Sequence, residues 1–167
     1  DRTESPYVCI VNSDCVVRDI GWIRTMGETL LKLRSEGVKM VAPKTNNPRI
    51  IGCDAKFEAQ QGGQQGGPDI ILEGNNYLSM YCFMCHRDLF RKIGFLKEYP
   101  YGFFEDEEFA FRMKSHGYKQ AVCGKGWIYH EGGCTIKSLW RKNPQSRNVM
   151  EKDNRQRCIE DMKVGKP

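Results

Sequence analysis

The sequence has no apolar run of the roughly 20 residues that a membrane-spanning helix requires. Its N-terminus lacks the charged-then-apolar pattern of a secretory signal, and the chain opens at Asp1 with no initiator Met. The eight cysteines do not form the dense lattice of a small disulfide-stapled domain. We therefore expect part of a longer chain that carries reduced thiols and lies in the cytoplasm, either free or peripheral at the membrane.

Charge is unevenly distributed. The net charge is +5, from 26 basic and 21 acidic residues, and the segment from Lys137 to Pro167 alone carries nine Lys or Arg against four Asp or Glu. Trp140 is the only aromatic residue of that segment, so it lacks the stacking platform of nucleic-acid binders, and we expect no nucleic-acid partner. We divide the chain into a body, residues 1–135, and a basic helical tail, residues 136–167. A solvated helix face is the simpler interpretation of the tail, and contact with phosphates or acidic lipid stays open.

The body alternates short apolar runs with helical patterns, which is typical of an α/β fold. Residues 7–11 and 38–43 read as strands buried on both faces, separated by a helix that ends at Gly37. Further strands are predicted over residues 70–72, 77–84, 118–123 and 127–129, and further helices over residues 87–93 and 105–116. The Gln-Gln-Gly-Gly repeat over residues 60–67 predicts a loop, either inert or a lid.

Two segments place carboxylates where chemistry is expected. Asn12-Ser13-Asp14 follows the first strand, and ligands of open α/β sheets gather at such strand ends. Carboxylate oxygens also suit a hard divalent cation. Four acidic residues, 105–108, open a helix directly after Phe103 and Phe104. A carboxylate held beside such apolar walls can serve as a general base.

Other features of the two carboxylate segments have simpler explanations. The positive end of the helix dipole, and an i,i+4 pair between Glu108 and Arg112, account for Glu107 and Glu108.

His130 ends an apolar strand and precedes two glycines. A lone His is more often structural than a ligand, but with Asp14 and Asp106 it completes an Asp/His set that Mn²⁺ or Mg²⁺ can use.

These segments together resemble family-2 glycosyltransferases of the GT-A fold. Asn12-Ser13-Asp14 resembles their Asp-x-Asp motif. Residues 82–96 resemble an apolar strand that meets Arg-Arg-x-x-Phe-x-x-x-Gly-x-Phe-Asp, and residues 105–118 resemble their Glu-Asp-x-Asp helix ending in Gly-Tyr. His130 falls where those enzymes place a metal-ligating His. The order of these pieces over residues 7–135 makes the resemblance specific.

The resemblance implies a partial, Rossmann-like three-layer fold with a mixed, mostly parallel sheet flanked by helices. It implies an inverting, metal-dependent transfer from a UDP-, GDP- or dTDP-sugar to a hydroxyl of a glycan or lipid-linked acceptor, as in polysaccharide biosynthesis. Asp106 would be the catalytic base and Glu105 would orient it or the acceptor. Asn12 and Asp14 would meet the nucleotide-sugar, and Asp14 and His130 would ligate Mn²⁺ or Mg²⁺.

The sequence also departs from the family pattern. Asn12 stands in place of the first Asp, His86 in place of an Arg, and Leu96 in place of the Asp after Phe. The family's nucleotide-binding N-terminal half has no counterpart among these residues. We therefore expect a fragment that lacks the usual donor-binding residues and has an open sheet edge available for self-association, and its activity alone stays open.

Four alternatives stay open, and one of them, a nucleic-acid binder that uses the basic tail, is disfavoured by the single aromatic residue there. A non-catalytic glycan- or phosphate-binding remnant would keep the fold without turnover. Cys82-x-x-Cys85-His86 matches the c-type haem attachment pattern, although it lies in an expected buried strand. Zinc at these two cysteines would need a second ligand pair, and the sequence has no second close pair.

Overall fold

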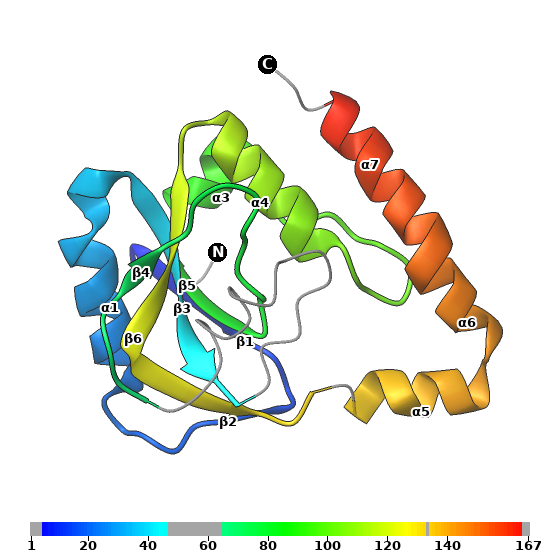
Figure 1. Cartoon of the computed structure of the whole chain (residues 1–167), viewed down its shortest axis with the longest axis horizontal. Coiled ribbons are helices and arrows are strands. Elements are labelled where there is room, and N and C mark those ends of the chain that lie inside the picture. Colours follow the sequence, from blue (N-terminus) through cyan, green and yellow to red (C-terminus); the bar gives the residue numbers. More distant parts are fainter. Residues whose placement is uncertain (1–4, 47–64, 133, 165–167) are drawn as a thin grey trace.

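The computed structural model describes residues 5–46, 65–132 and 134–164, which form an α/β fold with a mixed sheet flanked by helices (Figure 1). The strands are β1 (Tyr7–Val11), β2 (Cys15–Val16), β3 (Val38–Thr45), β4 (Ile70–Ile71), β5 (Cys82–His86) and β6 (Lys119–His130). The α-helices are α1 (Trp22–Lys32), α3 (Asp88–Ile93), α4 (Glu105–Ser115), α5 (Cys134–Lys142), α6 (Gln145–Asn148) and α7 (Asn154–Val164). A 3₁₀ turn, η1 (Arg34–Glu36), follows α1, and a π-helical turn, η2 (Val149–Asp153), precedes α7.

The sheet has the order β1-β5-β3-β6-β2, and β4 adds to β6. Among the described strands, β3 and β6 form the one parallel pair, and the other four pairings are antiparallel. The expectation of a mixed sheet is confirmed, but that of a mostly parallel one is wrong. The helix α1 carries the chain from β1 to β3 as a parallel crossover would, yet β5 lies between these strands and runs opposite to both.

Helices cover both faces of the sheet. On one face Trp22, Met26 and Leu30 of α1 pack against the sheet residues Val41 and Met84. On the other face α3 and α4 pack against the neighbouring sheet residues, with Phe90, Phe109 and Met113 in a second core cluster. Adjacent strand residues alternate between the two clusters, as the two-residue repeat of a strand requires.

Several element boundaries differ from the predictions. The strand β1 is only half-buried, because β5 pairs with it on one side and no described strand pairs on the other. The expected strand over residues 77–84 begins only at Cys82. The two strands expected over residues 118–129 are one, β6, with a register shift between Cys123 and Trp127. A Cβ at Gly124 would lie 2.3 Å from the carbonyl oxygen of Pro68, so this glycine permits a close approach and does not mark a turn.

The basic tail is helical, as expected, and Asn143-Pro144 separates α5 from α6. Its last helix, α7, lies against α4 (Figure 1). Of the described helices, none combines the length and the apolar character needed to cross a bilayer. The Gln-Gly repeat predicted to be a loop lies outside the described residues, apart from Gln65, Gly66 and Gly67.

Candidate functional site

The turn after β1 holds the first predicted site residues. Asn12 donates its backbone N–H to the carbonyl of Tyr81 (2.8 Å), and Cys15 donates its own to the carbonyl of Asn12 (3.1 Å). The short strand β2 then pairs with the end of β6, so that Cys15 lies opposite His130. The chain therefore brings Asp14 to His130 by backbone pairing between segments more than 100 residues apart.

Asp14 and His130 are in contact. The Oδ1 atom of Asp14 lies 3.5 Å from Nε2 of His130, and their side chains are 21% and 14% exposed. The Sγ atom of Cys15 joins them, because the three ligand atoms lie within 4.8 Å of one another. Burial, and next the charge of Asp14, raise the pKa of the Cys15 thiol to about 11. That thiol already donates to the carbonyl of Tyr81 (3.4 Å).

Two neighbours fix His130 in place. The side-chain amide of Asn46 accepts the backbone N–H of His130 (2.8 Å) and donates to its carbonyl (3.1 Å). The ring of Tyr81 stacks on the imidazole with centroids 4.8 Å apart. The hydroxyl of Tyr81 donates to the carbonyl of Pro43, which holds the stacked ring against β3. Packing and hydrogen bonds of this kind hold a functional side chain in one orientation.

Glu105 and Asp106 open helix α4, as predicted. Burial, and next the charge of Glu105, raise the pKa of Asp106 to about 7, although its carboxylate accepts the backbone N–H groups of Asp106 and Met80. Burial also raises the pKa of Glu105. The Oε2 atom of Glu105 is buried and accepts no hydrogen bond from any described residue. Two adjacent carboxyl groups with raised pKa values in a cavity are typical of an active site.

A single cavity of about 370 Å³ brings these predicted residues together. Its lining includes Asn12, Glu105, Asp106 and His130. Asp14 does not line the cavity, but it contacts His130, which does. Aromatic rings supply much of the remaining wall, namely those of Tyr77, Tyr81, Phe83, Tyr101, Phe103 and Phe104. The cavity combines convergent polar groups with apolar walls, as small-molecule sites do.

The loop before α4 has an unusual backbone. Tyr101, Phe103 and Phe104 have φ values of 63°, 73° and 74°, with Gly102 between them at 88°. Each such non-glycine residue costs about 1–2 kcal/mol. This strained loop forms one wall of the cavity and leads directly into Glu105 and Asp106. Strain of this kind persists only where the surrounding structure imposes it.

The C-terminal helix α7 holds this loop in its strained conformation. The side-chain amide of Asn154, buried in α7, donates to the carbonyls of Pro100 and Gly102, both at 2.8 Å. Cys158 of α7 packs with Tyr99 and Phe104 in a small apolar cluster. The tail, for which the sequence suggested a solvated face, therefore supports the loop that presents the two carboxylates.

Other candidate residues have structural roles. Glu108 is buried and forms a bidentate pair with Arg112 (2.7 Å), as the i,i+4 spacing predicted. Cys82 and Cys85 are both buried, in core clusters on opposite faces of the sheet. One haem or one zinc ion cannot reach both thiols in that arrangement, so the structure argues against both alternatives.

Sequence reasoning missed Asn46, Tyr81 and Asn154. Asn46 directly follows β3, and the same strand-end argument that identified Asp14 would have found it. Tyr81 lay inside an expected strand, where an aromatic residue needs no explanation. Nothing near Asn154 in the sequence indicates that its partners are the carbonyls of Pro100 and Gly102.

The sequence was also compared with known proteins. No model of a protein family matches the chain, and a search of curated proteins found no match.

Proposed function

We propose that this chain is the acceptor-side catalytic part of an inverting, metal-dependent glycosyltransferase of the GT-A, family-2 kind. The observation that carries the proposal is the convergence of four of the predicted residues in one cavity, with the fifth in contact. Asn12, Glu105, Asp106 and His130 line the cavity, and Asp14 lies 3.5 Å from His130. The substrates would be a nucleotide-sugar and an acceptor with a free hydroxyl.

Asp14, Cys15 and His130 are the potential donors for Mn²⁺ or Mg²⁺ at this site. Asp14 offers a carboxylate oxygen and His130 an imidazole nitrogen, and Mn²⁺ in particular accepts both kinds of donor. Two protein ligands leave positions free for diphosphate oxygens and water. The Cys15 thiol is a soft donor that is already engaged with a carbonyl. The residues fit such an ion with Asp14 and His130 as ligands, and the bound ion would neutralise charge on the leaving diphosphate.

The remaining roles belong to the carboxylates. Asp106 accepts the proton of the acceptor hydroxyl as the acceptor oxygen attacks the anomeric carbon. A pKa of about 7 suits this task, since the carboxylate is largely ionised at slightly alkaline pH and still holds a proton well. The partnerless oxygen of Glu105 is available to a hydroxyl of the acceptor. The aromatic walls exclude water that would otherwise compete as the acceptor.

A release assay tests the proposal. The protein is incubated with Mn²⁺ and UDP-, GDP- and dTDP-sugars in turn, with and without a panel of saccharide acceptors, and freed nucleoside diphosphate is measured. We expect acceptor-dependent release that falls about 100-fold or more in Asp106→Asn. Glu98→Gln is the control, because Glu98 is exposed and does not line the cavity, and it should retain release.

The result also separates transfer from binding alone. Mn²⁺ and nucleotide binding without release from any donor would favour a non-catalytic glycan- or phosphate-binding remnant. Release that is unchanged in Asp106→Asn would contradict the role of Asp106 as the base.

A further inference from the structure

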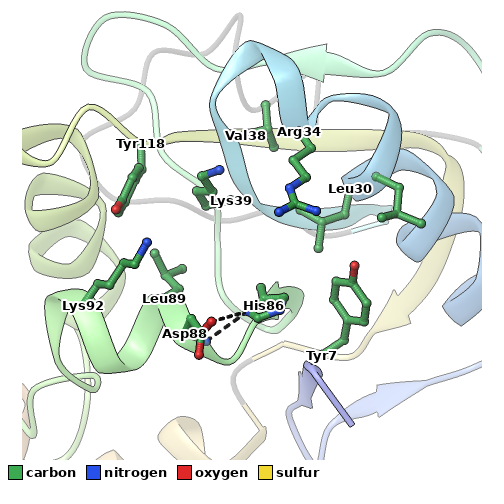
Figure 2. A pocket seen from close by; sticks show the side chains of 11 residues that line it. Tyr7, Leu30, Arg34, Val38, Lys39, His86, Asp88, Leu89, Lys92 and Tyr118 are labelled. Atoms are coloured by element: carbon green, nitrogen blue, oxygen red, sulfur yellow. Dashed lines mark hydrogen bonds and ion pairs between the residues drawn. The ribbon is translucent and has the colours of Figure 1, made fainter.

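A second cavity, of about 190 Å³, lies at the opposite end of the sheet. Tyr7 and His86, which line it, are the first residue of β1 and the last of β5, whereas Asn12 follows the far end of β1. The five residues of β1 span roughly 17 Å at about 3.3 Å per residue, so this cavity is separate from the candidate site. Figure 2 shows the basic side chains of η1, β3 and α3 around this space.

The polar lining of this cavity is predominantly cationic. Arg34, Lys39 and Lys92 come from three different elements, and Figure 2 shows their side chains around one space. In the described part of the chain, no carboxylate forms an ion pair with any of the three. Convergent cations without partners repel one another, and an anionic ligand relieves that repulsion.

The one acidic residue in the lining is already engaged. Asp88 pairs with Arg91 (2.9 Å), which lies outside the cavity, and its second oxygen lies 3.5 Å from Nδ1 of His86. The backbone N–H of Asp88 also donates to that same Nδ1 atom (3.2 Å). Asp88 therefore does not neutralise the three cations, and they remain available to a ligand.

The rest of the lining is apolar. Leu30 and Leu89 face the cavity, together with the rings of Tyr7 and Tyr118. The ammonium group of Lys39 lies 5.9 Å from the centre of the Tyr118 ring, which holds the lysine beside the cavity without neutralising it. A cavity whose lining combines cations with leucines and tyrosines matches a ligand that carries both an anionic group and an apolar body.

We propose that this cavity binds a small organic phosphate, with the phosphoryl group held by Arg34, Lys39 and Lys92 and the organic group against Leu30 and Leu89. Phosphate suits the site because three donors from different directions match its several acceptor oxygens. The proposal does not depend on the glycosyltransferase assignment, since the two cavities share no lining residue.

An NMR titration of the ¹⁵N-labelled chain tests this site, with phenyl phosphate, inorganic phosphate and the neutral benzyl alcohol as probes. We expect phenyl phosphate to shift the amides of Lys39, His86 and Tyr118 and to bind more tightly than either other probe. Raising the salt concentration should weaken binding, as for any ligand held by exposed cations.

Charge-removing variants sharpen the test. Lys39→Gln with Lys92→Gln should weaken binding about tenfold or more, because each charged hydrogen bond contributes substantially to affinity. The control, Lys137→Gln with Lys163→Gln, removes the same charge from the exposed tail and should bind like the original chain. Arg34→Gln provides a second variant if the first pair does not fold. Equal affinity in the cavity and tail variants, or no phenyl phosphate shifts around the cavity, would overturn the proposal.

Discussion

Burial and the charge of Glu105 raise the pKa of Asp106 to about 7, far above the ordinary value of an aspartate near 4. In the unfolded chain Asp106 loses its proton near that ordinary value, so between about pH 4 and 7 the folded state binds more protons. The contribution of Asp106 to folding is therefore full below pH 4 and is lost as the pH rises through 7. A residue that suits base catalysis at neutral pH thus destabilises the fold there.

Asp106→Asn should consequently stabilise the protein at pH 8, on the order of 2 kcal/mol, because a neutral amide replaces a buried charge. The gain should shrink toward pH 4, where the native carboxyl is already protonated. Thermal unfolding of both proteins across this pH range measures it. Asp153→Asn, at an exposed position, serves as the control and should change little at any pH. A variant that is less stable than the original at pH 8 would contradict the raised pKa.

At the scale of elements, the loop before α4 and the helix α7 form one unit. Tyr101, Phe103 and Phe104 keep left-handed backbone conformations that few residues of their size adopt. Tyr99 donates its hydroxyl to Asp161 of α7 (2.9 Å), and Lys97 pairs with the same carboxylate (3.1 Å). These contacts lie on the loop segment just before the carboxylates, so α7 bears on the site without lining it.

Asn154→Ala should therefore destabilise the protein by about 2–3 kcal/mol, since two carbonyls lose their donor in a buried place. Urea unfolding measures the loss. Hydrogen exchange should also become faster at Phe103, Phe104 and Glu105 than elsewhere, because the loop loses its support. Asn148→Ala, on the exposed face of α6, is the matched control. Uniform acceleration over the whole chain would mean that Asn154 supports only global stability.

The sequence predicts elements better than it predicts their arrangement. Hydrophobic spacing located β1, α3 and α4 almost to the residue, and Gly94 ends α3 as expected. The helix expected to end at Gly37 is shorter, because α1 ends at Lys32 and the 3₁₀ turn η1 leads to Gly37. It misassigned the run from Tyr77 to Tyr81, where burial without strand pairing produces the same apolar pattern. The antiparallel direction of β5 and the contact of Asn154 with the loop depend on tertiary packing, which local residue patterns do not encode.

The sequence likewise indicates the candidate site residues but not the residues that hold them in place. Asp14, Glu105, Asp106 and His130 were identified by residue type at element ends, and the fold brings them together. Their supports, Asn46 and Tyr81, act through backbone clamping and ring stacking, which need coordinates to be recognised.

At the scale of the whole molecule, the sheet separates two chemically different cavities. The cavity at the carboxyl end of β1 carries carboxylates, an imidazole and aromatic walls. The cavity at the other end carries three cations. Only the first lies beside Asp14 and His130, the donors that the proposed function assigns to a metal ion. Ligand binding that requires a metal ion would therefore distinguish the first cavity from the second.

The most direct measurement is calorimetric titration of Mn²⁺ into the chain, with and without UDP. Asp14→Ala serves as the site variant, and Glu131→Gln, next to His130 but exposed, serves as the control. The proposed function predicts that Mn²⁺ binds, that UDP tightens this binding, and that Asp14→Ala abolishes it while Glu131→Gln preserves it. Mn²⁺ binding that is indifferent to both UDP and Asp14→Ala, or no binding at all, would contradict a nucleotide-sugar metal site at Asp14 and His130.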